Sequence, residues 1–150
     1  MKIEKERKFL LKKLPVMKYA DISHIYQAYA EGWRYRSSLN QGTNKFNFEK
    51  LKKVKVGTGI NHEIDVEQIT YEQFTEGTNK RDRSITKDRY TIEYKGKKFE
   101  VDYFYKMSLV VCEVEDVDMD TVIEFPPEIE KLILLEVTGN PNFDNFNLAS

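Results

Sequence analysis

The chain has 150 residues, with 24 Lys and Arg, 25 Asp and Glu and a formal net charge of −1, and this length favours one domain with a sizeable core. Hydrophobic residues make up 40%, too many for a disordered chain, and the near-neutral charge argues against a general nucleic-acid-binding protein. One cysteine, Cys112, and two separated histidines, His24 and His62, exclude a thiolate zinc site and a paired-histidine zinc hydrolase.

Alternation of apolar and polar residues predicts eight strands, in chain order 2–11, 25–30, 33–39, 46–56, 60–67, 84–95, 98–106 and 109–117. The clearest hairpin signal is Lys95-Gly96-Lys97, which joins two strongly alternating segments. Short helices are expected near 16–23, 68–76, 126–135 and 142–149. The chain is therefore predicted to form a single domain over 1–150 of mainly β (α+β) class, with an antiparallel sheet curled or closed into a barrel.

Like charges recur two residues apart on the predicted strands, so they share one face of the strand while apolar residues occupy the other. A solvated polar face would explain any single strand. Like charges repel, however, and mixing signs within each strand would be the less strained surface. The acidic candidates are Glu4, Glu6, Glu63, Asp65, Glu100, Asp102, Glu113 and Glu115; the basic ones are Lys8, Arg34, Arg36, Lys87, Arg89 and one lysine of residues 50–55.

Strands sorted by sign in this way favour a closed sheet with its charged face inward. Such a lumen is costly unless the charges find partners. Carboxylates suit a hard dication, and guanidinium and ammonium groups suit a polyanion. The spacing alone therefore predicts a metal-assisted polyphosphate site.

Several motifs along the chain resemble the CYTH superfamily, also called triphosphate tunnel metalloenzymes. The first is ExExK at Glu4–Lys8 near the N-terminus. The others that carry the resemblance are Gln27-Ala28-Tyr29, Arg34-Tyr35-Arg36, Leu51-Lys52, Asn61–Asp65, Lys87–Tyr90, Phe99–Asp102, Val111–Glu115 and Glu136–Ala149. These segments follow in the family's order, from residue 3 to residue 149.

This resemblance implies an eight-stranded antiparallel tunnel that binds a triphosphate with Mg²⁺ or Mn²⁺ and hydrolyses tripolyphosphate, a nucleoside triphosphate or thiamine triphosphate. By position it assigns the metal to Glu4, Glu6, Glu63, Asp65, Glu113 and Glu115, and the phosphates to Lys8, Arg34, Arg36, Lys52 and Arg89. It assigns Lys87, beside Arg89, to orienting or deprotonating the attacking water. A minority of the family makes cyclic AMP, so an adenylate cyclase is one alternative.

The sequence departs from the family pattern at three places, where Asn61 and Asn142 stand for expected arginines and Asn140 for an aspartate. Fewer fixed cations neutralise a triphosphate less well, which makes a non-catalytic polyphosphate- or nucleotide-binding protein a second alternative. The lysine of residues 50–55 is also open, because Lys52 and Lys53 lie on opposite faces of the predicted strand.

No apolar run is long enough to span a membrane, and the N-terminal MKIEKERKFLL is too charged for a signal peptide. The expectation is a cytoplasmic monomer or homodimer. Its partner is a triphosphate-containing small molecule, with no nucleic acid and no membrane.

Overall fold

A computed structural model describes residues 2–150, and in them the chain forms nine strands and a few short helices. The strands are β1 (Lys2–Leu11), β2 (Asp21–Ala30), β3 (Trp33–Asn40), β4 (Phe46–Gly57), β5 (Ile60–Gln68), β6 (Arg83–Tyr94), β7 (Lys97–Phe104), β8 (Leu109–Glu115) and β9 (Ile133–Glu136). The helices are α1 (Tyr71–Thr78), α2 (Pro127–Glu130) and α3 (Asn145–Leu148), with a 3₁₀ turn, η1 (Pro141–Phe143).

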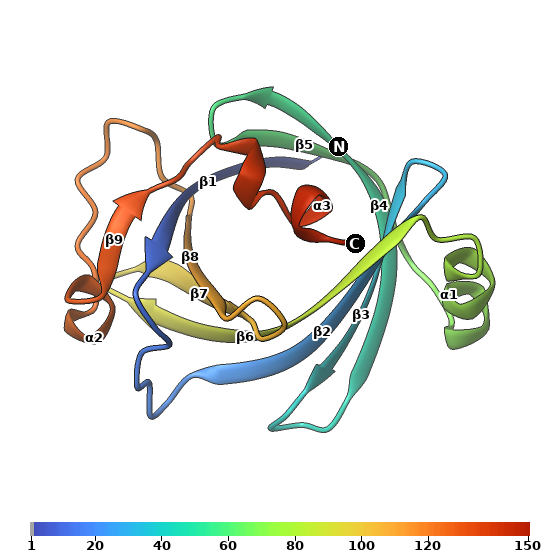
Figure 1. Cartoon of the computed structure of the whole chain (residues 1–150), viewed down its shortest axis with the longest axis horizontal. Helices are drawn as coiled ribbons and strands as arrows, with labels where there is room; N and C mark the ends of the chain where they lie inside the picture. Colours follow the sequence, from blue (N-terminus) through green and yellow to red (C-terminus); the bar gives the residue numbers. More distant parts are fainter. Residues whose placement is uncertain (1) are drawn as a thin grey trace.

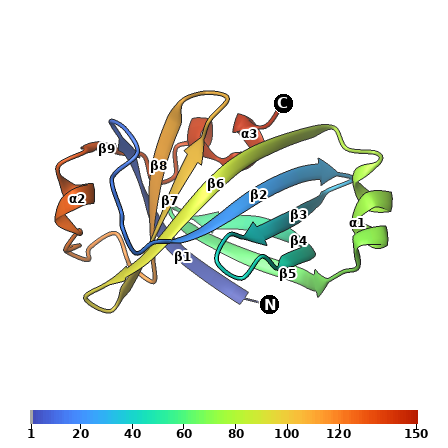
Figure 2. The same cartoon turned by 90° about the horizontal axis from the view of Figure 1, so that it is seen from below.

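All strand pairings are antiparallel, and the sheet order is β5-β4-β3-β2-β6-β7-β8-β1-β9 with a further pairing of β5 to β1. That extra pairing, Lys2–Lys5 against Ile60–Glu63, closes strands β1 to β8 into a barrel. Figure 1 looks into the ring of strands, with α3 across its opening, and Figure 2 shows α1 and α2 at opposite ends of the molecule. The predicted eight-stranded antiparallel barrel is confirmed, with β9 as an added strand along β1.

Two of the helix predictions are wrong because strand pairing overrides local pattern. The helix expected over 16–23 is replaced from Asp21 onward by β2, whose first residues join the ladder with β6. Of the helix expected over 126–135 only α2 forms, and the chain then pairs as β9 with Phe9–Leu11 of β1. Tertiary hydrogen bonding outweighs helix propensity at both places.

The apolar faces of the strands point outward and pack beneath the helices. Phe9, Phe99 and Cys112 form one cluster with Ile129 of α2, and Tyr35 forms another with Phe74 of α1. Helix α1 begins at a capping box in which Thr70 and Gln73 satisfy each other's backbone N–H groups. With the apolar faces covered from outside, the polar faces are left to the interior of the barrel.

The turn between β4 and β5 brings the backbone against β1 at Gly59. Gly59 has φ +69°, and a Cβ there would collide with the Glu6 carbonyl oxygen. The Gly59 carbonyl accepts a 2.9 Å hydrogen bond from the Glu6 N–H. Glycine is therefore required at this turn, which holds Glu6 at the wall of the barrel.

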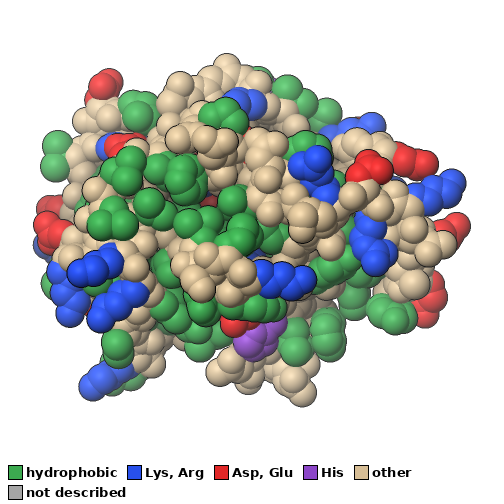
Figure 3. Space-filling view, viewed as in Figure 1, with side chains coloured by type: hydrophobic (Ala, Val, Ile, Leu, Met, Phe, Trp, Pro, Cys, Tyr) green, Lys and Arg blue, Asp and Glu red, His purple; other side chains and the backbone are tan. Residues whose placement is uncertain are grey.

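No helix in residues 2–150 is both long enough and apolar enough to cross a membrane. On the face seen in Figure 3, hydrophobic and uncharged atoms fill most of the middle, and acidic side chains gather toward the two sides.

Candidate functional site: a charged tunnel

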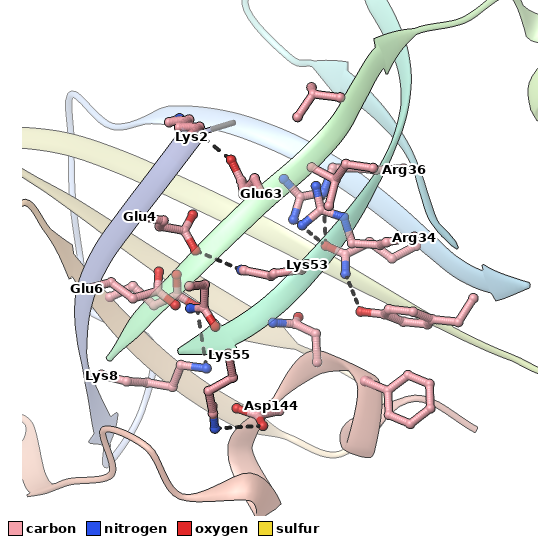
Figure 4. A pocket seen from close by; sticks show the side chains of 18 of the residues that line it. Lys2, Glu4, Glu6, Lys8, Arg34, Arg36, Lys53, Lys55, Glu63 and Asp144 are labelled. Atoms are coloured by element: carbon pink, nitrogen blue, oxygen red, sulfur yellow. Dashed lines mark hydrogen bonds and ion pairs between the residues drawn. The ribbon is translucent and has the colours of Figure 1, made fainter. Parts of the chain in front are cut away.

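The barrel encloses a cavity of about 690 Å³ whose lining is dominated by charged side chains. The acidic lining residues are Glu4, Glu6, Glu49, Glu63, Asp82, Glu100, Glu113, Glu115 and Asp144, and the basic ones are Lys2, Lys8, Arg34, Arg36, Lys53, Lys55, Arg89 and Lys98. Figure 4 shows Glu4 and Glu6 on β1 on the opposite side of the cavity from Arg34 and Arg36 on β3. We call the side of β1 and β8, with Glu4, Glu6, Glu113 and Glu115, the acidic wall, and the side of β3, with Arg34 and Arg36, the basic wall. Each wall also holds an opposite charge, since Lys8 lies 3.8 Å from Glu113 and Glu49 lies 3.7 Å from Arg34.

Most of the side chains predicted for the site do line this cavity. They are Glu4, Glu6, Lys8, Arg34, Arg36, Glu63, Arg89, Glu113 and Glu115. Alternation along a strand sufficed to place them, because residues two apart share a face. Their chemical roles stay predictions.

Lys52 does not belong to the lining, and Lys53 and Lys55 take its place. The register pairs Arg34 with Leu51, and directly opposed residues share a face, so the odd-numbered residues of β4 point inward with Arg34. The Lys52 ammonium lies instead 4.6 Å from the centre of the Trp33 ring. The inward position predicted for Lys52 therefore belongs to Lys53, and contact of Lys53 with phosphate stays a prediction.

Asp65 is likewise absent from the lining and is exposed. The pairing passes from Lys50↔Glu67 to Lys52↔Ile64, so β5 carries one extra residue there, and Asp65 takes the left-handed conformation with φ +53°. Such a bulge reverses which side chains point inward, and Val66 faces the cavity instead. Of the two metal ligands predicted on β5, only Glu63 lines the cavity, and its binding of a metal stays a prediction.

Lys87 lies behind the cavity wall, with no exposed surface. Its ammonium donates to Asp102 Oδ2 at 2.7 Å and to Asn145 Oδ1 of α3 at 2.9 Å. Burial lowers the pKa of Lys87 to about 7, with Arg89 and Arg36 acting in the same direction against the attraction of Asp102. Asn145 covers the amine, so Lys87 does not line the cavity, and its role toward an attacking water stays a prediction.

Arg89 connects this buried group to the cavity. Its guanidinium binds Asp102 through Nε–Oδ1 at 2.8 Å and Nη2–Oδ2 at 2.9 Å. It also reaches Glu100 at 3.1 Å. Asp102, which is 1% exposed, therefore fixes both Lys87 and Arg89. The sequence suggested that Asp102 lines the lumen, but it lies beneath the lining as a structural partner.

The arginines of the basic wall are only partly satisfied by hydrogen bonds within residues 2–150. Arg36 is held by the Gln27 amide oxygen, at 3.0 Å from Nε and 2.6 Å from Nη2. Arg34 is 9% exposed, and within residues 2–150 its buried Nε–H has no hydrogen-bond partner. Burial and the nearby charges of Arg34 and Arg89 lower the pKa of Arg36. Crowded cations with an unsatisfied N–H are the arrangement that an anion with several oxygens stabilises.

On the acidic wall, carboxyl groups lie close to one another and repel when both are charged. The Glu6 and Glu113 carboxyl groups hydrogen-bond one another, and so do those of Glu100 and Glu115. Burial and the charge of Glu113 raise the pKa of Glu6 to about 9, and burial with Glu100 raises that of Glu115 to about 7. Lys8 and Arg89 outweigh burial to hold the pKa of Glu113 well below its usual value.

These carboxyl groups form pairs. In residues 2–150 no group of three or more His, Cys, Asp or Glu side chains is arranged to hold a metal ion. The donor set nevertheless fits one. Two carboxyl groups that share a proton in a buried site present oxygen donors to a hard dication, which can replace that proton.

The raised pKa of Glu6 sets an expected pH dependence of stability in the presence of a chelator. Because the folded-state pKa is about 9 and the ordinary value 4.5, the folded protein binds more protons than the unfolded chain between these values. The contribution of Glu6 is full below the lower value and is lost as the pH rises toward the upper one. Denaturant unfolding from about pH 5 to about pH 9 should therefore show the wild type losing stability relative to Glu6→Gln. A constant difference between the two proteins would contradict the shared proton.

The C-terminal segment completes the cavity from one side. Lys8 Nζ donates to the Phe143 carbonyl at 3.0 Å, and Lys55 binds Asp144 at 3.3 Å. Asn145 and Phe146 of α3 join the lining. The sequence left the choice between Lys52 and Lys53 open, and it gave no indication of Glu49, of Asp144 or of the contact by which Asn145 covers Lys87. Glu49 and Lys53 could be assigned only once it was known that the odd-numbered residues of β4 point inward.

The chain thus forms a closed barrel of eight antiparallel strands around an acidic and a basic wall, which is the tunnel that the motifs in the sequence led us to expect. No protein-family model and no curated protein matches the sequence. Among solved structures, the chain is similar to the protein NE1496, a hypothetical protein in one structure (26% identity, TM-score 0.62, 97% of each chain covered) and an inorganic triphosphatase in another (24%, TM-score 0.62, 99% of this chain and 95% of that one).

A more distant similarity is to HpAC1 from Hippeastrum, an adenylyl-cyclase candidate with a dominant triphosphatase activity. It is 13% identical with a TM-score of 0.50, over 79% of this chain and 80% of that one. At this identity the likeness concerns the fold alone.

Proposed function

We propose that the protein is a metal-dependent triphosphatase that removes the terminal phosphate of a triphosphate-containing small molecule inside the tunnel. The observation that carries the proposal is the composition of one cavity. Buried carboxyl groups that pair with one another, Glu6 with a raised pKa among them, lie across from closely spaced arginines, and the buried Nε–H of Arg34 has no hydrogen-bond partner in residues 2–150. Mg²⁺ or Mn²⁺ with a chain of phosphates satisfies both walls. Similarity to NE1496, an inorganic triphosphatase, supports this assignment.

In this proposal the two walls have separate tasks. Glu4, Glu6, Glu113 and Glu115, with Glu63, would hold the ion, which when bound supplies positive charge to the phosphate oxygens and the leaving group. The basic side chains of the lining would hold the chain in line; they are Lys8, Arg34, Arg36, Lys53 and Arg89. Positioning and charge neutralisation are most of what phosphoryl transfer requires from a protein.

Hydrolysis breaks the bond between the terminal phosphorus and its bridging oxygen, while water forms the new bond to phosphorus. Of the two cations Lys87 and Arg89 on β6, only Arg89 lines the cavity. Asp102 and Lys87 lie behind Arg89 and hold it in place. We assign Lys87 as a positioning residue that acts through Asp102 and Arg89, because its ammonium does not reach the cavity.

The test is release of orthophosphate from tripolyphosphate, ATP and thiamine triphosphate, with Mg²⁺, with Mn²⁺ and with EDTA. Release that requires a divalent ion supports the proposal and ranks the substrates. Formation of cyclic AMP and diphosphate from ATP would overturn it in favour of a cyclase. Calorimetric binding of tripolyphosphate without turnover under either metal would overturn it in favour of a binding protein. The cavity-lining Asn61, in place of an arginine, makes that second outcome worth measuring.

A further inference from the structure

Lys53 joins the two walls of the tunnel. It leaves β4 on the same inward face as Leu51, yet its ammonium crosses to the acidic wall and meets Glu4 Oε1 of β1 at 2.8 Å. Figure 4 shows this contact spanning the space between the strands. Its register partner on β5, Glu63, also lines the cavity. A protein cation therefore lies beside carboxylates that we assign to a metal.

Lys55, two residues further along β4, provides a comparison. Lys55 faces the cavity too, but its ammonium pairs with Asp144, beside α3, at 3.3 Å. Asp144 belongs to neither of the carboxyl pairs described above. The two lysines thus differ in which acidic group they neutralise, while their side chains and strand are the same.

An ammonium and a dication near one carboxylate repel each other, and the repulsion is strong where water is partly excluded. The Lys53 side chain is 32% exposed and that of Glu4 is 17% exposed. A lysine stem is long and rotatable, so its head can exchange one anion for another without moving the backbone. The nearest alternative anion in a loaded tunnel is the phosphate chain itself.

We propose that Lys53 is an exchangeable counter-ion of the acidic wall: its ammonium neutralises Glu4 in the empty tunnel and leaves it for a phosphate oxygen when a metal ion and a polyphosphate bind. This inference rests on the proposed function. It makes metal binding and phosphate binding cooperative through one side chain, because the phosphate draws away the group that opposes the metal.

The proposal predicts opposite effects of one substitution on two ligands. Lys53→Met keeps the length of the side chain and removes its charge. Mg²⁺ alone, titrated by calorimetry, is expected to bind Lys53→Met about tenfold more tightly than the wild type, which corresponds to about 1.4 kcal/mol. Tripolyphosphate in EDTA is expected to bind it about tenfold more weakly, because a phosphate donor is lost. Lys55→Met is the matched control, and its Mg²⁺ affinity should change much less.

The outcomes separate the inference from the function on which it rests. Equal or weaker Mg²⁺ binding by Lys53→Met, with the wild type binding the ion, would overturn the exchange and leave the metal site standing. A loss of affinity for both ligands would show a merely structural role and would also overturn it. Absence of Mg²⁺ binding in the wild type and in both variants would overturn the metal site itself. Thermal unfolding of the variants checks that all of them are folded.

Discussion

A Glu113→Gln variant is expected to release phosphate at least about 100-fold more slowly than the wild-type protein, on whichever triphosphate the latter hydrolyses fastest. Glu113 lies where the two walls meet: it hydrogen-bonds Glu6, lies 3.8 Å from the Lys8 ammonium and pairs in register with Glu100. The amide keeps the shape but carries no charge, so the metal loses a ligand while Lys8 and Arg89 lose a counter-ion. Steady-state phosphate release at saturating Mg²⁺ measures the effect.

The matched control for this variant is Glu93→Gln. Glu93 is an exposed carboxylate of β6 outside the cavity lining, so the same change of charge there should leave phosphate release near the wild-type rate. Titration with Mg²⁺ adds a second reading, since Glu113→Gln should also bind the ion more weakly. Wild-type kcat in Glu113→Gln would remove the acidic wall from the mechanism.

An Asp102→Asn variant is expected to lose about 3–5 kcal/mol of unfolding free energy, because it leaves buried cations without their carboxylate. Asp102 accepts hydrogen bonds from Lys87 at 2.7 Å and from Arg89 at 2.8 and 2.9 Å, and its own carboxylate is buried. The amide keeps one acceptor oxygen in place of two, and its nitrogen, which is itself a donor, opposes an N–H that the carboxylate accepted. Denaturant unfolding, compared at constant slope, measures the loss.

A second substitution tests the cause of that loss. Adding Lys87→Met to Asp102→Asn removes the unpaired ammonium, while Arg89 keeps Glu100 at 3.1 Å. The double variant should therefore regain part of the stability. Asp88→Asn is the surface control: its carboxylate contacts His24 at 2.7 Å at an exposed site, and the expected cost is under about 1 kcal/mol. An Asp102→Asn loss as small as that of the control would contradict the role of the buried network.

Much of the tunnel could be predicted from the sequence because alternation is a local property. Whether Glu4 and Glu6 share a face depends only on the pleat of their own strand, and the same holds for Arg34 and Arg36 and for Glu113 and Glu115. Closure then follows from the sorting of charges, since an inward charged face needs an enclosed ligand.

What could not be predicted depends on relations between strands. The choice between Lys52 and Lys53 follows from the pairing of Leu51 with Arg34, which no pattern within β4 reveals. The exclusion of Asp65 follows from one extra residue in β5, set by its register with β4. The depth of Lys87 follows from the packing of Asn145 over it, and β9 forms only because β1 offers an edge there.

The closure of the barrel by β1 also determines when, during folding, a site can exist. Glu6 pairs in register with Glu115, so ligands of the acidic wall come from opposite ends of the sequence. Contacts between residues so distant in the chain cost loop entropy before they gain energy, and they make folding slow compared with that of local helices. The hairpins of β2 to β5 can form early from neighbouring residues, and with them the basic wall at Arg34 and Arg36. The acidic wall requires β1 to meet β8, so the proposed metal site can form only when these two strands pair. Metal added during refolding is therefore expected to act on that step rather than on the early hairpins.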